Sequence, residues 1–336
     1  MVTARQVSLG VARAIRAMER DAERAQRQRI AEEKARAKQA MLDASADAAD
    51  AYDRFIHLLI DAHRIPFERR DWTTIAAAAS PPDAVRTPDH ENVAAGALAR
   101  YRPGWFEEVL GIANRKRARL AAAITRARAL DDETFAEAKG KIAARRKEIE
   151  FARSVLAREH PAMTKAIGLH GDFTGTAIEG VKVVYLDGRV IAVVDGFEVD
   201  DLPTNTIRLL QSGKISTKPL PMSKIFELHR DTICSSALRV AAEFLKILPL
   251  NIVEVVVHCD LLDRSSGHIN ARPVFYVLVA AQALSNLNLE LADPAPLAER
   301  LGADFEWNKR EGFHGIDLAA HEIPKDICNR ERPDNF

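Results

Sequence analysis

The sequence predicts an α+β fold, with helices in the first half of the chain and a mixed or antiparallel sheet in the second. Three observations carry this prediction. The turn Asp187-Gly188 joins two β-branched runs, a stripe of apolar residues at helical spacing follows Ser223, and two continuous apolar runs occupy residues 252–257 and 274–279. Together they predict two hairpins flanking one long helix, preceded by a long N-terminal helix and an antiparallel, coiled-coil-like helical hairpin.

The first β-hairpin is predicted from its turn. Residues 181–186 and 189–194 are rich in valine, and only Asp187-Gly188 separates them. Both turn residues accept the positive φ angles of a type I′ turn. The two strands are therefore expected to pair antiparallel.

The long helix is expected to begin near Ser223, whose hydroxyl can cap the first N–H groups, and to end at Pro249. The two apolar runs that follow it are too continuous for strands with one face in water. Both faces of the sheet must therefore be covered. The long helix covers one face, and we expect the N-terminal helices to cover the other.

Residues 7–51 contain no proline and predict one long first helix. Its beginning carries an alanine-rich heptad seam, which would bury little area and which ends at Arg29. The seam consists of Val11, Ile15, Met18, Ala22 and Ala25. Two interpretations stay open: a solvated helix held by i,i+4 ion pairs, or a helix that docks on a protein partner or on its own copy.

Two further apolar seams, at residues 106–127 and 135–156, predict the helical hairpin. Leu130-Asp131 lies between them and is short enough to force two helices antiparallel, with Asp131 as the cap of the second helix. In the register that follows, every apolar seam residue meets an apolar residue. The expected helical hairpin spans residues 105–159.

Arg117 and Arg145 are the one flaw in that register, because they face each other. Arginine stays protonated at any working pH, so the two charges cannot be buried together unpaired. Three interpretations stay open. Both side chains reach outward to water, or they straddle a carboxylate from elsewhere in the chain, or they mark the docking site of an anionic partner.

The chain is expected to divide into a helical part, residues 1–168, and an α+β domain, residues 169–323. A proline-rich linker lies near residues 80–88, and the polar tail 324–336 is expected to be mobile. The net charge is zero, but it is about +7 before Gly168 and about −7 after it. Three interpretations of this asymmetry stay open: the oppositely charged halves dock, the helices are simply solvated, or the basic half binds an anionic partner such as nucleic acid.

The sequence contains no phosphate-binding glycine loop and no G-x-S-x-G nucleophile motif, and it predicts no cofactor. The one cluster that suggests catalysis or a metal site follows the strand at 252–257. It comprises His258, Asp260, Asp263 and His268, whose imidazoles and carboxylates could bind a divalent metal if the loop folds back. The alternative is an ordinary polar turn from Asp263 to Gly267.

These patterns favour a non-enzymatic assembly or interaction protein, whose helices dock a protein partner or a second copy. The alternatives are a metal-dependent nucleic-acid hydrolase using His258, Asp260 and His268, and a nucleic-acid-binding protein without catalysis. Binding of nucleic acid would use two basic groups, Arg115, Lys116, Arg117 and Arg119, and Arg145, Arg146 and Lys147.

Three cysteines without paired spacing favour a reducing compartment, and we expect the protein in the cytoplasm. No apolar run reaches the roughly 20 residues of a membrane span, so no membrane partner is expected.

Overall fold

The computed structural model describes residues 4–324 and 327, with side chains described at 26, 27 and from 29 onward. The chain forms two compact units. The sheet unit takes in Met1–Phe67, Asp172–Glu243 and Asn251–Phe336, and the helical unit takes in Glu68–Gly171 and Phe244–Leu250. The first long helix therefore groups with the sheet. The tail 325–336, except for Ile327, lies outside the described residues.

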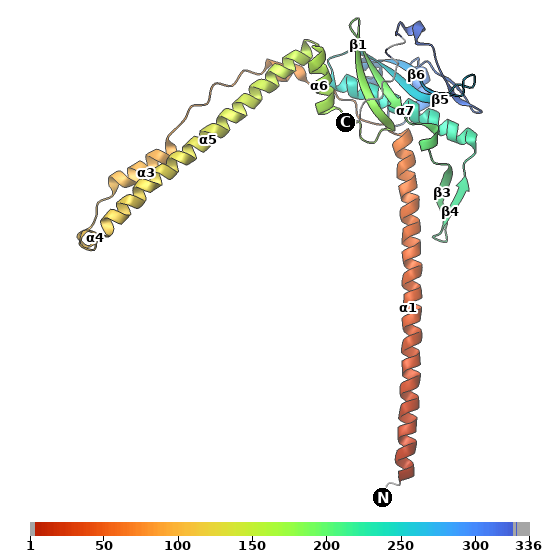
Figure 1. The fold of residues 1–336 in the computed structure, drawn as a ribbon, viewed down its shortest axis with the longest axis horizontal. Helices are drawn as coiled ribbons and strands as arrows, with labels where there is room; N and C mark the ends of the chain where they lie inside the picture. The colour runs from red at the N-terminus through yellow and green to blue at the C-terminus, as the bar shows by residue number, and fades with distance from the viewer. Residues whose placement is uncertain (1–3, 325–326, 328–336) are drawn as a thin grey trace. The chain divides into compact units, whose positions relative to one another are not determined.

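The sheet has four strands in the order β1-β2-β5-β6, as predicted from two hairpins (Figure 1). These are β1 (Ile178–Leu186), β2 (Arg189–Gly196), β5 (Ile252–Leu262) and β6 (Ile269–Ala280). Within each hairpin the strands are antiparallel, and β2 pairs parallel with β5. Asp187 and Gly188 have φ angles of 47° and 80°, which confirms the predicted turn between β1 and β2.

The long helix is α7 (Met222–Ile247), which connects β2 to β5 and packs against one face of the sheet. Close packing is needed at Gly196, where a Cβ would lie 2.8 Å from Ile233 of α7 and from Val257 of β5. Between β2 and α7 the chain forms the short helix η1 (Val199–Asp201) and a separate hairpin. The strands of that hairpin are β3 (Asn205–Leu209) and β4 (Ile215–Pro219).

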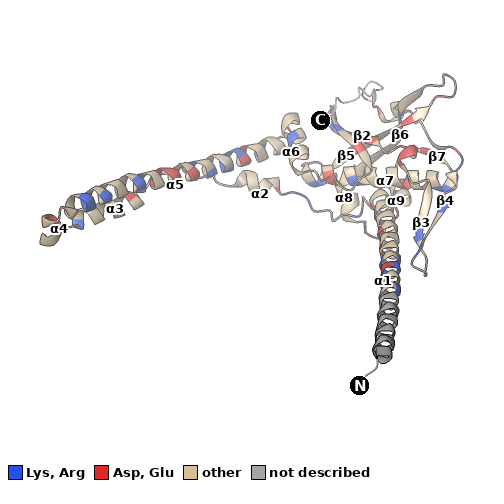
Figure 2. Cartoon of the chain, turned by 60° about the horizontal axis from the view of Figure 1, so that its bottom comes forward, with Lys and Arg blue, Asp and Glu red and all other residues tan. Residues whose placement is uncertain are grey.

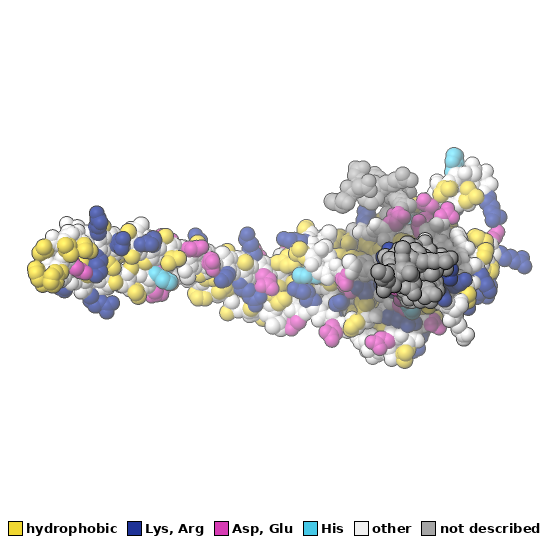
Figure 3. Space-filling model, turned by 90° about the horizontal axis from the view of Figure 1, so that it is seen from below, with side chains coloured by type: hydrophobic (Ala, Val, Ile, Leu, Met, Phe, Trp, Pro, Cys, Tyr) yellow, Lys and Arg dark blue, Asp and Glu magenta, His cyan; other side chains and the backbone are white. Residues whose placement is uncertain are grey.

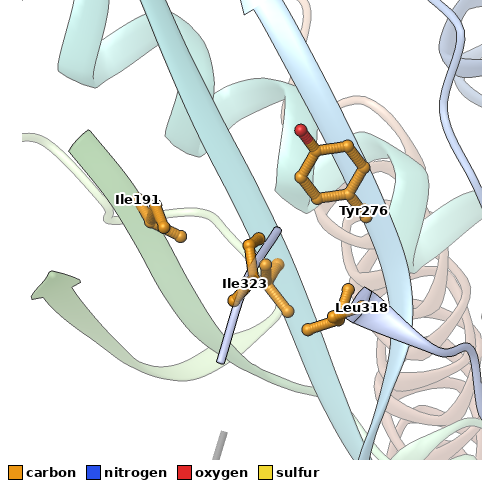
Figure 4. Packing of buried hydrophobic residues seen from close by; sticks show 5 residues of the cluster. Ile191, Tyr276, Leu318 and Ile323 are labelled. Carbon is orange, nitrogen blue, oxygen red and sulfur yellow. The ribbon is translucent and has the colours of Figure 1, made fainter. Parts of the chain in front are cut away.

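The other face of the sheet is covered by the C-terminal segment, so the expectation that the N-terminal helices cover it is wrong. Leu318 and Ile323 pack there on Ile191, Val256 and Tyr276. Figure 4 shows Ile323 and Leu318 over the side chains from β2 and β6. The part of this segment on that face includes η2 (Leu318–His321), and it is preceded by α8 (Ala281–Ser285), α9 (Pro294–Arg300), β7 (Glu306–Asn308) and β8 (Gly312–His314). The β7–β8 hairpin packs instead on α7, where Trp307 Nε1 donates to the Phe226 carbonyl.

The first helix, α1 (Ala4–Ile60), is longer than predicted and continuous. Its C-terminal end packs into the sheet unit, where Leu59 forms a core cluster with Ala177, Leu202 and Ile225. The β3–β4 hairpin lies against it further back, because Gly213 is in contact range of Leu42. The heptad seam predicted from Val11 to Ala25 lies outside the described side chains.

The helical unit contains an antiparallel helix pair, but its two members are not the ones predicted. α5 (Ile112–Leu156) runs without interruption through Leu130-Asp131, so the predicted turn there is wrong. The antiparallel neighbour of α5 is α3 (Asp89–Arg100) (Figure 1). The remaining helices are α2 (Trp72–Ala77), α4 (Trp105–Val109) and α6 (His160–His170). Residues 80–88 carry no regular structure and join α2 to α3 within this unit.

Asp131 caps a helix as predicted, but the helix is α3. Its Oδ1 accepts from the backbone N–H of His90 at 3.1 Å, and its Oδ2 accepts from that of Glu91 at 2.9 Å. Burial raises the pKa of Asp131, but the hydrogen bonds from Glu91 and His90 outweigh it and hold that pKa below its ordinary value. A carboxylate in the middle of α5 thus fixes where α3 begins.

Candidate functional site

Two members of the predicted metal cluster lie on β5. The strand continues through His258 and Asp260, so both side chains lie on the face that carries Val256, as expected from the alternation. His258 is buried and pairs across the strands with Asp195 of β2. The backbone N–H of Asp260 donates to Glu198 Oε1 at 2.8 Å.

The other two members, Asp263 and His268, close the turn between β5 and β6. The Asp263 N–H donates to the His268 carbonyl at 2.8 Å. The Asp263 carboxylate accepts from the Ser265 hydroxyl at 2.6 Å and from its N–H at 2.9 Å, and these bonds lower the pKa of Asp263 to about 2. This is the polar turn that the sequence offered as the alternative.

The loop does not fold back on the strand. Five residues of extended chain separate His258 from Asp263, which corresponds to about 16 Å. Within the described parts of the chain, no three His, Cys, Asp or Glu side chains lie close enough together to hold a metal ion. The structure therefore does not assemble the expected metal cluster from His258, Asp260, Asp263 and His268.

A buried polar cluster that was not expected from the sequence lies on the face covered by the C-terminal segment. The Arg189 guanidinium of β2 makes two hydrogen bonds to the Glu254 carboxylate of β5. Nε donates to Oε1 at 2.7 Å, and Nη2 donates to Oε2. The Tyr276 hydroxyl donates to Glu254 Oε2 at 3.1 Å, and Arg189 Nη2 donates to the His321 carbonyl at 2.9 Å. Burial and the nearby Glu254 carboxylate raise the pKa of Tyr276 to about 12. The signal in the sequence was a single glutamate inside an apolar strand.

His321 extends this cluster toward the surface. Its ring stacks on Tyr276 with centroids 3.8 Å apart, and its Nε2 lies 2.8 Å from Asp304 Oδ2. Because Asp304 is also bridged to the Tyr276 backbone, these contacts join the C-terminal segment to β6. The cluster therefore connects β2, β5, β6 and η2 through polar contacts.

The basic residues proposed for an anionic partner form two groups far apart on α5. Arg117 and Arg145 lie 28 positions apart on one continuous helix, about 42 Å along its axis, so the prediction that they face each other is wrong. Arg115, Lys116 and Arg119 lie near the first of them. Figure 2 shows acidic residues interspersed with the basic ones along α5.

Intramolecular ion pairs occupy part of both groups. Lys116 Nζ lies 2.9 Å from Glu107 Oε1, and Arg145 Nη1 lies 2.6 Å from Glu148 Oε2. Arg146 also binds within the unit, with Nη1 2.9 Å from Asp83 Oδ1 and Nη2 donating to the Pro81 carbonyl. Lys147 is exposed, as are Arg115, Arg117 and Arg119. The remaining exposed charge is therefore concentrated at the beginning of α5.

The helix α1 carries an apolar stripe that the sequence reasoning did not use. Ile30, Ala37, Met41 and Ala44 follow one another at steps of seven, four and three residues, and all four are exposed. We call these four residues the α1 stripe. Such spacing places them on one side of a helix, in the pattern of a coiled-coil seam. Lys34 occupies the one heptad position of this seam, between Ile30 and Ala37, that is not apolar.

The strongest exposed apolar cluster lies at α4. Trp105, Phe106, Val109 and Leu110 are each between 64% and 73% exposed, and Ile112 is 46% exposed. We call these five residues the apolar tip. Phe106 and Leu110 were predicted as seam residues of the helical hairpin, and this assignment is wrong. Figure 3 shows hydrophobic side chains gathered at the end of the helical unit that carries α4.

No described helix is long and apolar enough to cross a membrane. No protein-family model matches the chain, and no curated protein or solved structure is similar enough to count as a relative.

Proposed function

We propose that the protein is a non-enzymatic assembly protein that docks another helix, from its own copy or from a protein partner, along α1. The single observation that carries this proposal is the exposed α1 stripe. Between residues 29 and 41 every described side chain of α1 is exposed, so nothing in the described part of the chain covers this stretch of the helix. Helices in proteins gain most of their stability by packing an apolar face against another element, and this favours a second helix as the cover of the α1 stripe.

The sequence of the stripe favours pairing with a helix over other modes of docking. Its steps of seven, four and three residues match the heptad that keeps two helices in contact. Lys34 within the seam is the kind of polar residue that sets register and oligomer number at some cost in stability. The small Ala37 and Ala44 allow the backbones to approach closely. We place this assembly in the cytoplasm, because the two cysteines in the described part of the chain, Cys234 and Cys259, form no disulfide.

The test compares two double variants of the full chain. Ile30→Glu with Met41→Glu introduces carboxylates into the α1 stripe, whereas Ala35→Glu with Gln39→Glu introduces them on the opposite side of the same exposed segment. Light scattering across a concentration series gives the mass. We expect the wild type and the Ala35/Gln39 variant to form the same oligomer, and the Ile30/Met41 variant to be monomeric.

A partner other than a second copy calls for a second measurement. A photoreactive residue at position 37, inside the α1 stripe, should crosslink to one specific protein in cells, whereas the same residue at position 35 should not. A wild-type monomer at all concentrations, together with no crosslink specific to position 37, would contradict the proposed assembly function.

A further inference from the structure

We propose that the apolar tip of the helical unit inserts into the surface of an anionic membrane. Trp105, Phe106, Val109, Leu110 and Ile112 fall within eight residues and remain largely exposed. Large exposed apolar clusters on a soluble chain mark interaction sites rather than ordinary surface. This inference concerns the helical unit and does not depend on the assembly proposed for α1.

The local structure holds these side chains outward. Gly104 precedes α4 in an extended conformation, and Gly111 follows it in the left-handed conformation with a φ of 67°, so the chain changes direction between α4 and α5. The rings of Trp105 and Phe106 lie 3.9 Å apart and form one apolar surface. The apolar tip therefore has a defined local structure at the point where the chain passes from α3 to α5.

A small polar network connects α4 to the chain on both sides of it through Glu107. Glu107 Oε2 accepts from the Tyr101 hydroxyl at 2.6 Å, and Glu107 Oε1 lies 2.9 Å from Lys116 Nζ. These contacts lower the pKa of Glu107, with the Tyr101 hydrogen bond as the largest cause and the Lys116 ammonium next. One of the two acidic side chains near the tip is thereby neutralised by its neighbours.

The charge around the tip identifies the partner. Between residues 100 and 119 the chain has six basic and two acidic side chains. The basic ones flank the tip on both sides, because Arg100 and Arg102 precede it and Arg115, Lys116, Arg117 and Arg119 follow it. Apart from Lys116, we call these arginines the basic collar. Arg119 lies seven residues beyond Ile112, about 10 Å along α5, so the collar stays within reach of a charged surface that the tip touches.

This combination fits a lipid surface. Interfacial segments place tryptophan, phenylalanine and leucine about 5–10 Å into the headgroup boundary, with lysine and arginine at the phosphates. The tip is a projecting end, as Figure 3 shows, and such a shape suits insertion into a deformable surface. The expectation of no membrane partner was based on the lack of a spanning segment, which insertion at the surface does not require.

The experiment measures flotation of the full-length protein with two kinds of vesicle, phosphatidylcholine alone and phosphatidylcholine mixed with phosphatidylglycerol. The tip variant is Trp105→Ser with Phe106→Ser. Its matched control is Val85→Ser with Val93→Ser, since these two valines are 81% and 71% exposed elsewhere in the same unit. We expect the wild type and the control to float with the anionic vesicles. We expect the tip variant to bind them at least about tenfold more weakly.

A second pair of variants tests the charge. Arg115, Arg117 and Arg119 changed to Gln remove three charges of the collar, and Arg145, Arg146 and Lys147 changed to Gln remove three charges at the far end of the same helix. One cationic side chain near an anionic bilayer is worth about a fivefold change in affinity, so the collar variant should bind about a hundredfold more weakly. The far-end variant should bind like the wild type.

Three outcomes would overturn the proposal. One is a wild type that floats with neither kind of vesicle. Another is an equal loss of vesicle binding in the collar and far-end variants, which would mean that binding depends on the overall positive charge and not on the basic collar. The third is an oligomer that the tip variant alone turns into a monomer, which would identify a second copy as the occupant of the tip. Each result is independent of the Ile30/Met41 test, so this proposal and the assembly function can fail separately.

Discussion

The buried ion pair between Arg189 and Glu254 makes a quantitative prediction about the stability of the sheet unit. Glu254 is 3% exposed and is bound by Arg189 and by the Tyr276 hydroxyl. Glu254→Leu removes the carboxylate, so the Arg189 guanidinium and the Tyr276 hydroxyl lose their hydrogen bonds to it. Removing one partner of a buried pair typically costs about 3–5 kcal/mol. The Arg189 side chain is 28% exposed and can reach water, so we expect the lower end of that range, about 3 kcal/mol.

Removing the other partner is expected to cost more. Arg189→Met leaves the more deeply buried Glu254 carboxylate with only the Tyr276 hydroxyl, so about 4–5 kcal/mol should be lost. The double variant, Arg189→Met with Glu254→Leu, removes both charges and replaces them with apolar groups. It should lose far less than the sum of the single variants, because no buried charge remains without its partner.

The assay is urea unfolding of the four proteins, followed by circular dichroism, with the free energies compared in a double-mutant cycle. The reasoning is refuted if the two single losses simply add in the double variant, because the cost would then not come from orphaned charges. It is also refuted if both single variants lose less than about 1 kcal/mol, which would mean that water reaches the cluster.

Two further predictions concern packing and a helix cap. Gly196→Ala should destabilise the sheet unit by about 1–3 kcal/mol in urea unfolding, because its methyl group would meet side chains of α7 and β5 at 2.8 Å. Gly180→Ala, which meets no atom within 4 Å, should be nearly neutral, and equal losses would count against this argument. Asp131→Asn should lower the melting temperature at neutral pH more than Asp132→Asn does. Since the folded pKa of Asp131 is depressed, its contribution is complete above its unfolded pKa of about 4 and is lost as the pH falls further. The difference from wild type should therefore close in acid, and a constant difference would contradict the role of the carboxylate.

The features that were predicted correctly are those whose signal is local. Asp187-Gly188 specifies its turn by the φ angles it accepts, and the stripe after Ser223 specifies a helix by its own period. The continuity of residues 252–257 also correctly indicated that both sheet faces are covered. Which element covers the second face was not predictable, because Leu318 and Ile323 lie in short, irregular segments without a repeating pattern.

The exposure of the candidate surfaces was likewise not predictable from local sequence patterns. Trp105 and Phe106 are apolar, and apolar residues at helical spacing indicate a buried seam in most proteins. Their exposure depends on the left-handed Gly111, which separates α4 from α5, and on where α3 ends, which the apolar spacing does not specify. The basic residues Arg115 to Arg119 were noticed as a possible anion site from composition alone. Their position next to the apolar tip is the basis on which we propose a lipid surface.

The predicted helical hairpin is wrong because its apolar pattern fits one continuous helix as well as two antiparallel helices. From residue 113 onward, the two predicted seams lie on one continuous stripe of α5, whose residues are buried or half-buried. A pattern that repeats every three or four residues is nearly symmetric about its midpoint, so folding it at Leu130-Asp131 pairs apolar with apolar by construction. The perfect register was therefore no independent support for a turn. What covers the stripe is a succession of elements: α3 lies along its first half, and near its end Trp72 of α2 packs edge-on against Phe151. A glycine or proline at the midpoint would have been independent support for a turn, and α5 has neither there, since Gly140 is the nearest.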